Sequence, residues 1–375
     1  MYDIAIIGAG PAGATLARLI ARRYRVLLVD RRDLSSPAGA RGAEKCCGGL
    51  LAPDAQQMLG RLGLGLPGRV LVAPQLFVVR AVDVRGGLQR FYQRHYINMD
   101  RGRFDRWLFS LVPPGVDCRA GWRLESCRRA RRGFALGLRR GRREFTERAR
   151  VLVGADGAGS QVRRLLGARR RCAPLLAVQQ WHETPHAPAH FAAIFDPDVT
   201  DFYAWAIPKG DALVVGSAVT TGREARAKLS RLAERLRLLG FALGRCIRRE
   251  AAGLVRPRLS SLPDPVAGDD AALIGEAAGF VSPSSAEGIS YALRSAVMLA
   301  EALSDGPDGA LRRYRRRASA LRRNIAAKCV KARLLGCGAA RRLVMASGLA
   351  SVDIGGRRRP VGRVRGSGLR PGEVL

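Results

Sequence analysis

The sequence predicts an α/β fold in which a parallel, dinucleotide-binding sheet is interleaved with an antiparallel sheet. Three observations support this prediction. The first thirty residues follow a strand, glycine turn, helix, strand pattern. Two further glycine-rich turns follow apolar runs near residues 154 and 275. Between these turns, apolar and polar residues alternate with the period of two that is typical of half-buried strands.

The first unit reads MYDIAIIGAGPAGATLARLIARRYRVLLVD. In its Gly-x-Gly-x-x-Gly spacing, Gly8 permits a tight turn, Gly10 lets the backbone approach a diphosphate, and Gly13 lets the helix pack closely on the strand. Asp30 follows about 20 residues later, where an acid accepts hydrogen bonds from a ribose diol. The unit therefore predicts a Rossmann-type site for a dinucleotide.

Composition limits the class of protein. The chain has 375 residues and is 47% hydrophobic, which is typical of one large or two interleaved globular domains. No apolar run approaches the roughly 20 residues of a membrane-spanning helix. The first predicted strand begins almost at Met1, so we expect a cytoplasmic protein without a leader peptide. Eight cysteines without a Cys-x-x-Cys pair indicate reduced thiols and no metal site.

The net charge of +34 comes almost entirely from arginine. One interpretation is a preference for arginine over the whole sequence. Another is attraction to an anionic membrane surface, where a basic residue contributes about 1 kcal/mol. Nucleic acid is the weaker alternative because no recognised nucleic-acid module is present.

A loop of small residues follows Asp30 and ends in Lys45, Cys46, Cys47, Gly48 and Gly49. These glycines let the backbone pass close to a ring or a phosphate, although no Gly-Lys-Ser/Thr makes the segment a P-loop. Cys47 is interpreted either as a thiol on the substrate side of a site or as a small buried apolar residue.

Residues 70–94 predict antiparallel strands, and a helix is predicted from Asp100. Arg101 and Asp105 have the spacing of an ion pair on one helix face, so Arg101 either forms that pair or contacts cofactor phosphates. The second glycine-rich turn, GADGAGSQVRR, contains Asp156. Asp156 can cap the following helix, but its place at the end of a parallel strand favours a role at the cofactor.

Residues 172–262 alternate like strands, with an amphipathic helix predicted over 222–248. Tyr203 and Trp205 share one face of a predicted strand because side chains alternate. They form either an ordinary sheet core or a flat apolar wall. The third glycine-rich turn follows the apolar strand near 272, where Glu276 can accept hydrogen bonds from a polyol chain. The backbone N–H groups near Gly288 can stabilise negative charge at the start of the next helix.

These segments carry a resemblance that covers nearly all of residues 1–345. GAGPAG with Asp30, GADGAGSQVRR and IGEAAGFVSPSSAEGISYAL resemble the fingerprints of FAD-dependent oxidoreductases with the p-hydroxybenzoate hydroxylase (GR2) type of fold. KCCGGL and YAWAIP are similar to segments of the geranylgeranyl reductase family within that group. The predicted FAD contacts are Gly8, Gly10, Pro11, Ala12, Gly13, Asp30, Arg31, Lys45, Cys46, Arg101, Asp156, Gly157, Gly275, Glu276, Gly288 and Ile289.

The same resemblance implies a substrate site. It places Cys47 at the substrate face of the flavin as the candidate catalytic residue. It assigns substrate binding to Gly48, Gly49, Tyr203, Trp205 and Pro208. Two residues depart from the family pattern: Glu276 stands where most relatives have Asp, and Cys46 where a small residue or proline is expected.

The resemblance also predicts the domain organisation. The FAD-binding domain is expected at 1–72, 95–171 and 263–305, the substrate domain at 73–94 and 172–262, basic helices at 306–350, and a disordered tail at 351–375. Leu334, Leu335, Leu343 and Val344 of the basic helices are interpreted as a membrane contact or as packing against the body.

The reaction implied is reduction of carbon–carbon double bonds in an isoprenoid or polyprenyl lipid, including one that bears a phosphate. NAD(P)H or another reductant would donate electrons transiently, because no second βαβ unit is visible. A flavin monooxygenase acting on an apolar substrate and a non-catalytic lipid-binding flavoprotein are the alternatives. Halogenases of this type carry a catalytic lysine in the span between Lys45 and Lys209. No lysine lies in that span here, so a halogenase is disfavoured. The sequence does not predict an oligomeric state.

Overall fold

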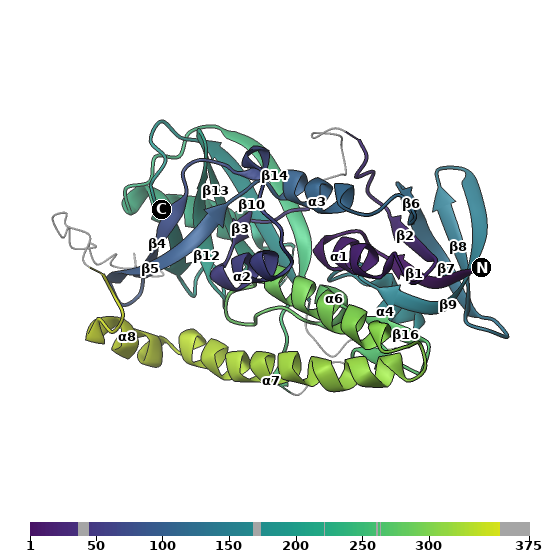
Figure 1. The fold of residues 1–375 in the computed structure, drawn as a ribbon. Coiled ribbons are helices and arrows are strands. Elements are labelled where there is room, and N and C mark those ends of the chain that lie inside the picture. Colours follow the sequence, from purple (N-terminus) through teal and green to yellow (C-terminus); the bar gives the residue numbers. More distant parts are fainter. Residues whose placement is uncertain (37–44, 168–173, 221, 260–261, 263, 353–375) are drawn as a thin grey trace, which may run out of the picture.

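The structure is a computed structural model that describes residues 1–36, 45–167, 174–220, 222–259, 262 and 264–352. Within these residues the named strands form two eight-stranded sheets. Figure 1 shows the sheets side by side, with helix α7 (Ala310–Gly336) running along both.

The first sheet is largely parallel. Its central strand β1 (Tyr2–Ile7) pairs in parallel with β2 (Val26–Asp30) and β9 (Arg143–Gly154). Strand β2 is buried along its whole length, as expected for a strand covered on both faces. The outer strands are β6 (Asp117–Ala120), β7 (Arg123–Arg129), β8 (Phe134–Arg140), β15 (Val266–Ala267) and β16 (Ala271–Leu273).

The second sheet has the strand order β14-β10-β13-β12-β11-β4-β5-β3. Its neighbours are antiparallel except for the parallel pair β11 and β4. The strands are β3 (Leu50–Leu51), β4 (Leu76–Asp83), β5 (Leu88–Asn98), β10 (Pro174–Glu183), β11 (Phe191–Phe195), β12 (Ala204–Lys209), β13 (Ala212–Val219) and β14 (Cys246–Val255).

The helices cover these sheets. Helices α1 (Pro11–Ile20) and α6 (Ile289–Ser304) pack together against the first sheet. Helix α5 (Ala225–Leu238) covers one face of the second sheet with its buried leucines. The others are α2 (Pro53–Arg61), α3 (Arg101–Ser110), α4 (Gln161–Leu165), α8 (Gly338–Ser347) and 3₁₀ turns at Gly68–Val70 and Gly275–Ala278.

The helix predicted over 222–248 is shorter than expected. It ends at Leu238, and Gly240 then adopts a positive φ of 86° that stops the helix. Residues from Cys246 form β14 instead. The basic helical region also divides, because extended backbone at Cys337 separates α7 from α8.

Some predictions are not settled by the structure. The domain boundaries remain predictions. The tail is expected to be disordered, and its residues from 353 on lie outside the described part of the chain. Residues 37–44 of the loop after Asp30 also lie outside it. Among the described helices, none has the length and apolar character needed to cross a membrane.

Candidate active site

The three glycine-rich turns meet at the carboxyl end of the first sheet. A Cβ on Gly8 would lie 2.4 Å from the carbonyl oxygen of Ala155, so the first and second turns touch through backbone. A Cβ on Gly275 would lie 3.2 Å from the Cβ of Ala12, so the third turn packs on the first helix. The predicted convergence of the three turns is confirmed. Gly13 supports it, because its own Cβ would lie 3.2 Å from the Cβ of Ala155 in the second turn.

The first helix begins in the way that diphosphate binding requires. Gly10 is the N-cap of α1 and supplies no side-chain cap, and Pro11 stands in the first turn. The backbone N–H groups of this turn therefore point out of the helix toward any bound phosphate.

The start of α6 differs from expectation. Gly288 is its N-cap and Ile289 is buried, but the carboxylate of Glu287 accepts hydrogen bonds from the backbone N–H and the hydroxyl of Ser290, both at 2.7 Å. Burial raises the pKa of Glu287. One of the N–H groups expected to face a reduced ring is therefore already used by Glu287.

Asp30 lies at the tip of β2, beside the first turn. Its carboxylate accepts a hydrogen bond from the Ala9 N–H at 2.7 Å and binds the Arg32 guanidinium at 3.0 Å. Arg31, a predicted FAD contact, is exposed, whereas Arg32, which was not predicted, binds the Asp30 carboxylate. The Arg32 guanidinium also lies close to Gly10, since a Cβ there would be 3.8 Å from it. A ribose hydroxyl would share or replace the Arg32 contact on Asp30.

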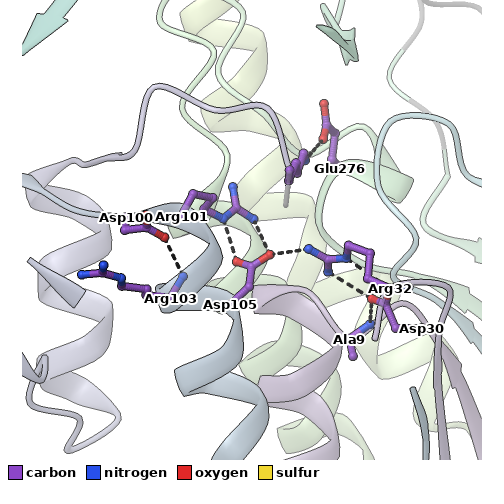
Figure 2. A network of polar contacts seen from close by, with 9 residues as sticks. Ala9, Asp30, Arg32, Asp100, Arg101, Arg103, Asp105 and Glu276 are labelled. Atoms are coloured by element: carbon purple, nitrogen blue, oxygen red, sulfur yellow. Dashed lines mark hydrogen bonds and ion pairs between the residues drawn. The ribbon is translucent and has the colours of Figure 1, made fainter. Parts of the chain in front are cut away.

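A buried charge network extends from Asp30 to Arg101 (Figure 2). Arg32 donates to Asp105 at 2.8 Å, and Asp105 accepts from Arg101 at 2.7 Å. Burial lowers the pKa of Arg101, but Asp105 and Cys47 outweigh it and hold that pKa above its ordinary value. Of the two interpretations of Arg101, the structure shows the helix-face pair with Asp105, while contact with cofactor phosphates stays a prediction.

Asp156 takes the capping role that was its alternative interpretation. Its carboxylate accepts hydrogen bonds from the backbone N–H groups of Gln161 at 2.6 Å and Val162 at 3.1 Å, at the start of α4. The neighbouring Gly157 has a positive φ of 75° and faces the Glu276 carboxylate. The second turn therefore approaches the third through Gly157 rather than through the Asp156 side chain.

Glu276 joins the third turn to the cysteine loop. Its carboxylate pairs with the Lys45 ammonium at 3.0 Å and accepts a hydrogen bond from the Val255 N–H at 3.3 Å. In Figure 2 Glu276 lies on the side of Arg101 away from Arg103. Lys45 and Glu276 were both predicted to face the cofactor, and the structure brings them together.

The cysteine loop lies directly on β12. A Cβ on Gly48 would be 2.6 Å from the Cδ1 of Ile207, and Gly49 has a positive φ of 62° above the Lys209 side chain. Glycine is thus required for close packing on the second sheet. Burial and the nearby Glu250 carboxylate of β14 raise the pKa of the Cys46 thiol to about 12.

Lys209 is a residue that the sequence interpretation missed as part of this site. Its ammonium donates to the carbonyl oxygens of Gly49 at 2.9 Å and Met99 at 2.8 Å, and to the Asn98 side chain at 2.5 Å. These partners are neutral, and burial lowers the pKa of Lys209 to about 7. Lys209 connects the Cys47 loop with the segment that precedes Arg101. Its even spacing from Trp205, four residues earlier, puts both side chains on the same face of β12 and was the available signal.

An apolar surface lies under the loop. We call it the aromatic wall; it consists of Tyr96, Trp181, Phe191, Tyr203 and Trp205. The rings of Tyr203 and Trp205 lie 6.2 Å apart, and the Tyr203 hydroxyl donates to the carbonyl oxygen of Ser285 in the third turn at 2.8 Å.

Pro208 does not belong to the aromatic wall. Because side chains alternate along β12, Pro208 lies on the opposite face from Trp205. Its carbonyl oxygen accepts a hydrogen bond from Asn98 at 2.8 Å. The Pro208 side chain therefore lies off the aromatic wall, and its role in substrate binding stays a prediction.

The uncapped turn of α1, the acid at the tip of β2 and the interlocked glycine turns fit the diphosphate, ribose and polyol groups of FAD. With the aromatic wall beside them, they define the chain as an FAD-dependent oxidoreductase. Residues 1–228 match the model of the FAD binding domain family, and the chain belongs to that family.

The curated relatives point to a narrower group. Protein CbrA from Escherichia coli O6:H1 is 40% identical over 358 residues, covering 94% of this chain and 94% of that protein. Protein CbrA from Shigella flexneri serotype 5b gives the same identity and coverage. The chain belongs to the same family as these proteins.

Solved structures share the fold. A geranylgeranyl bacteriochlorophyll reductase-like protein from Thermoplasma acidophilum has a TM-score of 0.76 at 19% identity, covering 90% of this chain and 88% of that one. PqsL, a probable FAD-dependent monooxygenase from Pseudomonas aeruginosa, has a TM-score of 0.68 at 22% identity, covering 93% and 99%. At these identities the likeness concerns the fold alone.

Proposed function

We propose that this protein reduces carbon–carbon double bonds of an isoprenoid or polyprenyl lipid. The observation that carries the proposal is the aromatic wall, which lies directly beneath the Cys47 loop and is tied to the third glycine turn by Tyr203. The fold likeness to a geranylgeranyl bacteriochlorophyll reductase-like protein supports it. Reduced FAD would supply the hydride.

The residues of the chain would bind the lipid and supply a proton. An isolated alkene is a poor hydride acceptor, so the site must hold the double bond in place and exclude water. Tyr203 and Trp205 offer flat apolar surfaces for this task. The Cys47 thiol would donate a proton to the second alkene carbon, and the positive charge of the nearby Arg101 would stabilise the thiolate that this transfer leaves.

A monooxygenase remains the second candidate, because PqsL shares the fold over 99% of its length. The two functions differ in what reoxidises the reduced protein. We would reduce the FAD-loaded protein with dithionite without oxygen, add geranylgeranyl phosphate, and follow the flavin absorbance. Reoxidation by the lipid alone supports the reductase. Reoxidation only with O₂, with labelled oxygen in the product, identifies a monooxygenase. Lipid that binds and is recovered unchanged under both conditions identifies a binding protein.

The lipid substrate suggests a membrane partner. Five apolar side chains of α7, α8 and the turn that follows are at least half exposed among basic residues: Val330, Leu334, Leu343, Val344 and Leu349. Such a surface suits peripheral contact with an anionic membrane. We propose that the protein takes its substrate from that surface, and that NAD(P)H or another reductant docks transiently.

A further inference from the structure

A cavity lies beside the aromatic wall. Its volume is about 460 Å³, and it lies where β13 ends and β10 begins. Helices α5 and α7 and the segment after β14 complete its lining, and Pro283 of the third glycine turn contributes one side. The cavity is thus separate from the Cys47 loop but shares the third turn with it.

The cavity carries positive charge. Four basic side chains line it from three separate elements: Lys228 on α5, Arg256 and Arg258 after β14, and Arg333 on α7. Asp201 is the acidic residue in the lining, and Glu224 pairs with Lys228 at 2.9 Å. Basic groups from three elements directed into one cavity are the arrangement that a multiply charged anion requires.

Arg256 is a half-buried member of this basic group. Its guanidinium lies over the Phe202 ring, 5.1 Å from the ring centroid. Burial lowers the pKa of Arg256, and the neighbouring Arg258 lowers it further, while Asp201 acts in the opposite direction. An anion in the cavity would offset the desolvation of Arg256 and its repulsion by Arg258.

The cavity adjoins the aromatic wall. The rings of Phe202 and Tyr203 lie 4.4 Å apart, so the side chain that lines the cavity touches the wall directly. On the other side, Pro283 lies two residues before Ser285, which accepts the Tyr203 hydrogen bond. A molecule with an anionic end in the cavity could therefore continue as an apolar chain along the wall.

We propose that this cavity binds the phosphate or diphosphate head of the lipid substrate while the isoprenoid chain lies on the aromatic wall. This inference rests on the proposed function, since it assigns the anion to the same substrate. The phosphate group that the cavity would bind could belong to a lipid or to a free phosphate ion. The two ligands differ in whether an attached apolar chain increases the affinity.

The test measures binding to the full-length, FAD-loaded, oxidised protein by titration calorimetry at low ionic strength. The probes are inorganic diphosphate, farnesyl diphosphate and farnesol. The variants are Arg333→Gln, which is exposed and should not affect folding, and the double change Arg256→Gln with Arg333→Gln. The matched control is Arg316→Gln, an exposed arginine of α7 outside the cavity.

We expect inorganic diphosphate to bind with one site per chain, and farnesyl diphosphate to bind at least tenfold more tightly. The single variant should weaken both, the double variant should weaken them by tenfold or more, and the control should match the unchanged protein. Unchanged binding in Arg333→Gln and in the double variant would overturn the proposal. Farnesyl diphosphate that binds no more tightly than diphosphate would show a free-phosphate site and would also contradict it. Because no turnover is involved, a failure of alkene reduction leaves these results unaffected.

Discussion

The ammonium group of Lys209 lies 2.9 Å from the carbonyl oxygen of Gly49, two residues after Cys47. Burial lowers the pKa of Lys209 to about 7, whereas the unfolded chain keeps an ordinary lysine value. Between those two values the unfolded chain binds a proton that the folded chain has lost. The free energy of unfolding should therefore rise as pH increases from about 7 to about 10, by roughly 1.4 kcal/mol per unit.

Urea unfolding at saturating FAD and several pH values tests this linkage. In Lys209→Met the contribution of this side chain to the slope should vanish, while Lys228→Met, at a surface ion pair, should keep the slope of the unchanged protein. Equal slopes in Lys209→Met and the unchanged protein would show that Lys209 does not titrate in this range.

Cys47→Ala should slow alkene reduction at least tenfold, because a positioned general acid contributes roughly 10²–10⁴-fold. FAD content should be unchanged. Cys118→Ala, an exposed cysteine on β6, is the matched control and should react at the normal rate. Single-turnover reoxidation of the reduced flavin measures both. Equal rates in the two variants would exclude Cys47 as the proton donor.

Gly216→Ala should displace Trp205, because a Cβ at Gly216 would lie 2.5 Å from the indole ring. We expect lipid affinity to fall about tenfold, or about 1.4 kcal/mol, with FAD retained. Gly253→Ala, on β14 of the same sheet, meets nothing within 4 Å and should bind lipid normally. Normal lipid affinity in Gly216→Ala would show that Trp205 does not form part of the lipid surface.

Asp30→Ala should weaken FAD binding tenfold or more. The change removes the acceptor for the Ala9 N–H and leaves Arg32 without one of its two carboxylates. Asp33→Ala removes a more exposed acid next to the same strand and should leave FAD affinity unchanged. Quenching of flavin fluorescence on titration with apoprotein gives both affinities, and a normal value for Asp30→Ala would contradict the assignment.

Replacement of Leu334, Leu343 and Val344 by serine should reduce sedimentation with vesicles that contain phosphatidylglycerol, and added salt should reduce binding of the unchanged protein. Leu238→Ser removes an equally exposed leucine from α5 and serves as the control. Vesicle binding that survives the triple change would place the membrane contact elsewhere.

The parallel sheet and its three turns could be predicted because glycine spacing reflects backbone contacts. Gly8, Gly13 and Gly275 each stand where another residue would collide with backbone or a neighbouring helix. Such local requirements are visible in a sequence. The end of α5 was missed although Gly240 marked it, because the apolar spacing continued past that glycine.

The parts of the site that depend on tertiary contacts were harder to predict. Lys209 reaches Gly49, and Arg32 reaches Asp105, only when segments distant in the sequence meet, so these partners were not visible in the sequence. Pro208 was assigned with its neighbours although strand alternation turns it to the other face. Asp156 had two chemically sound roles, and only the fold shows that its carboxylate caps α4.

Hydrogen transfer to the lipid tests the proposed reduction most directly. The FAD-loaded protein would be reduced with dithionite in D₂O without oxygen, mixed with geranylgeranyl phosphate, and the lipid analysed by mass spectrometry. We predict two added deuterium atoms for each double bond reduced, with none in a sample that lacks protein. Recovery of unchanged lipid from reduced protein that binds it would contradict the proposed function.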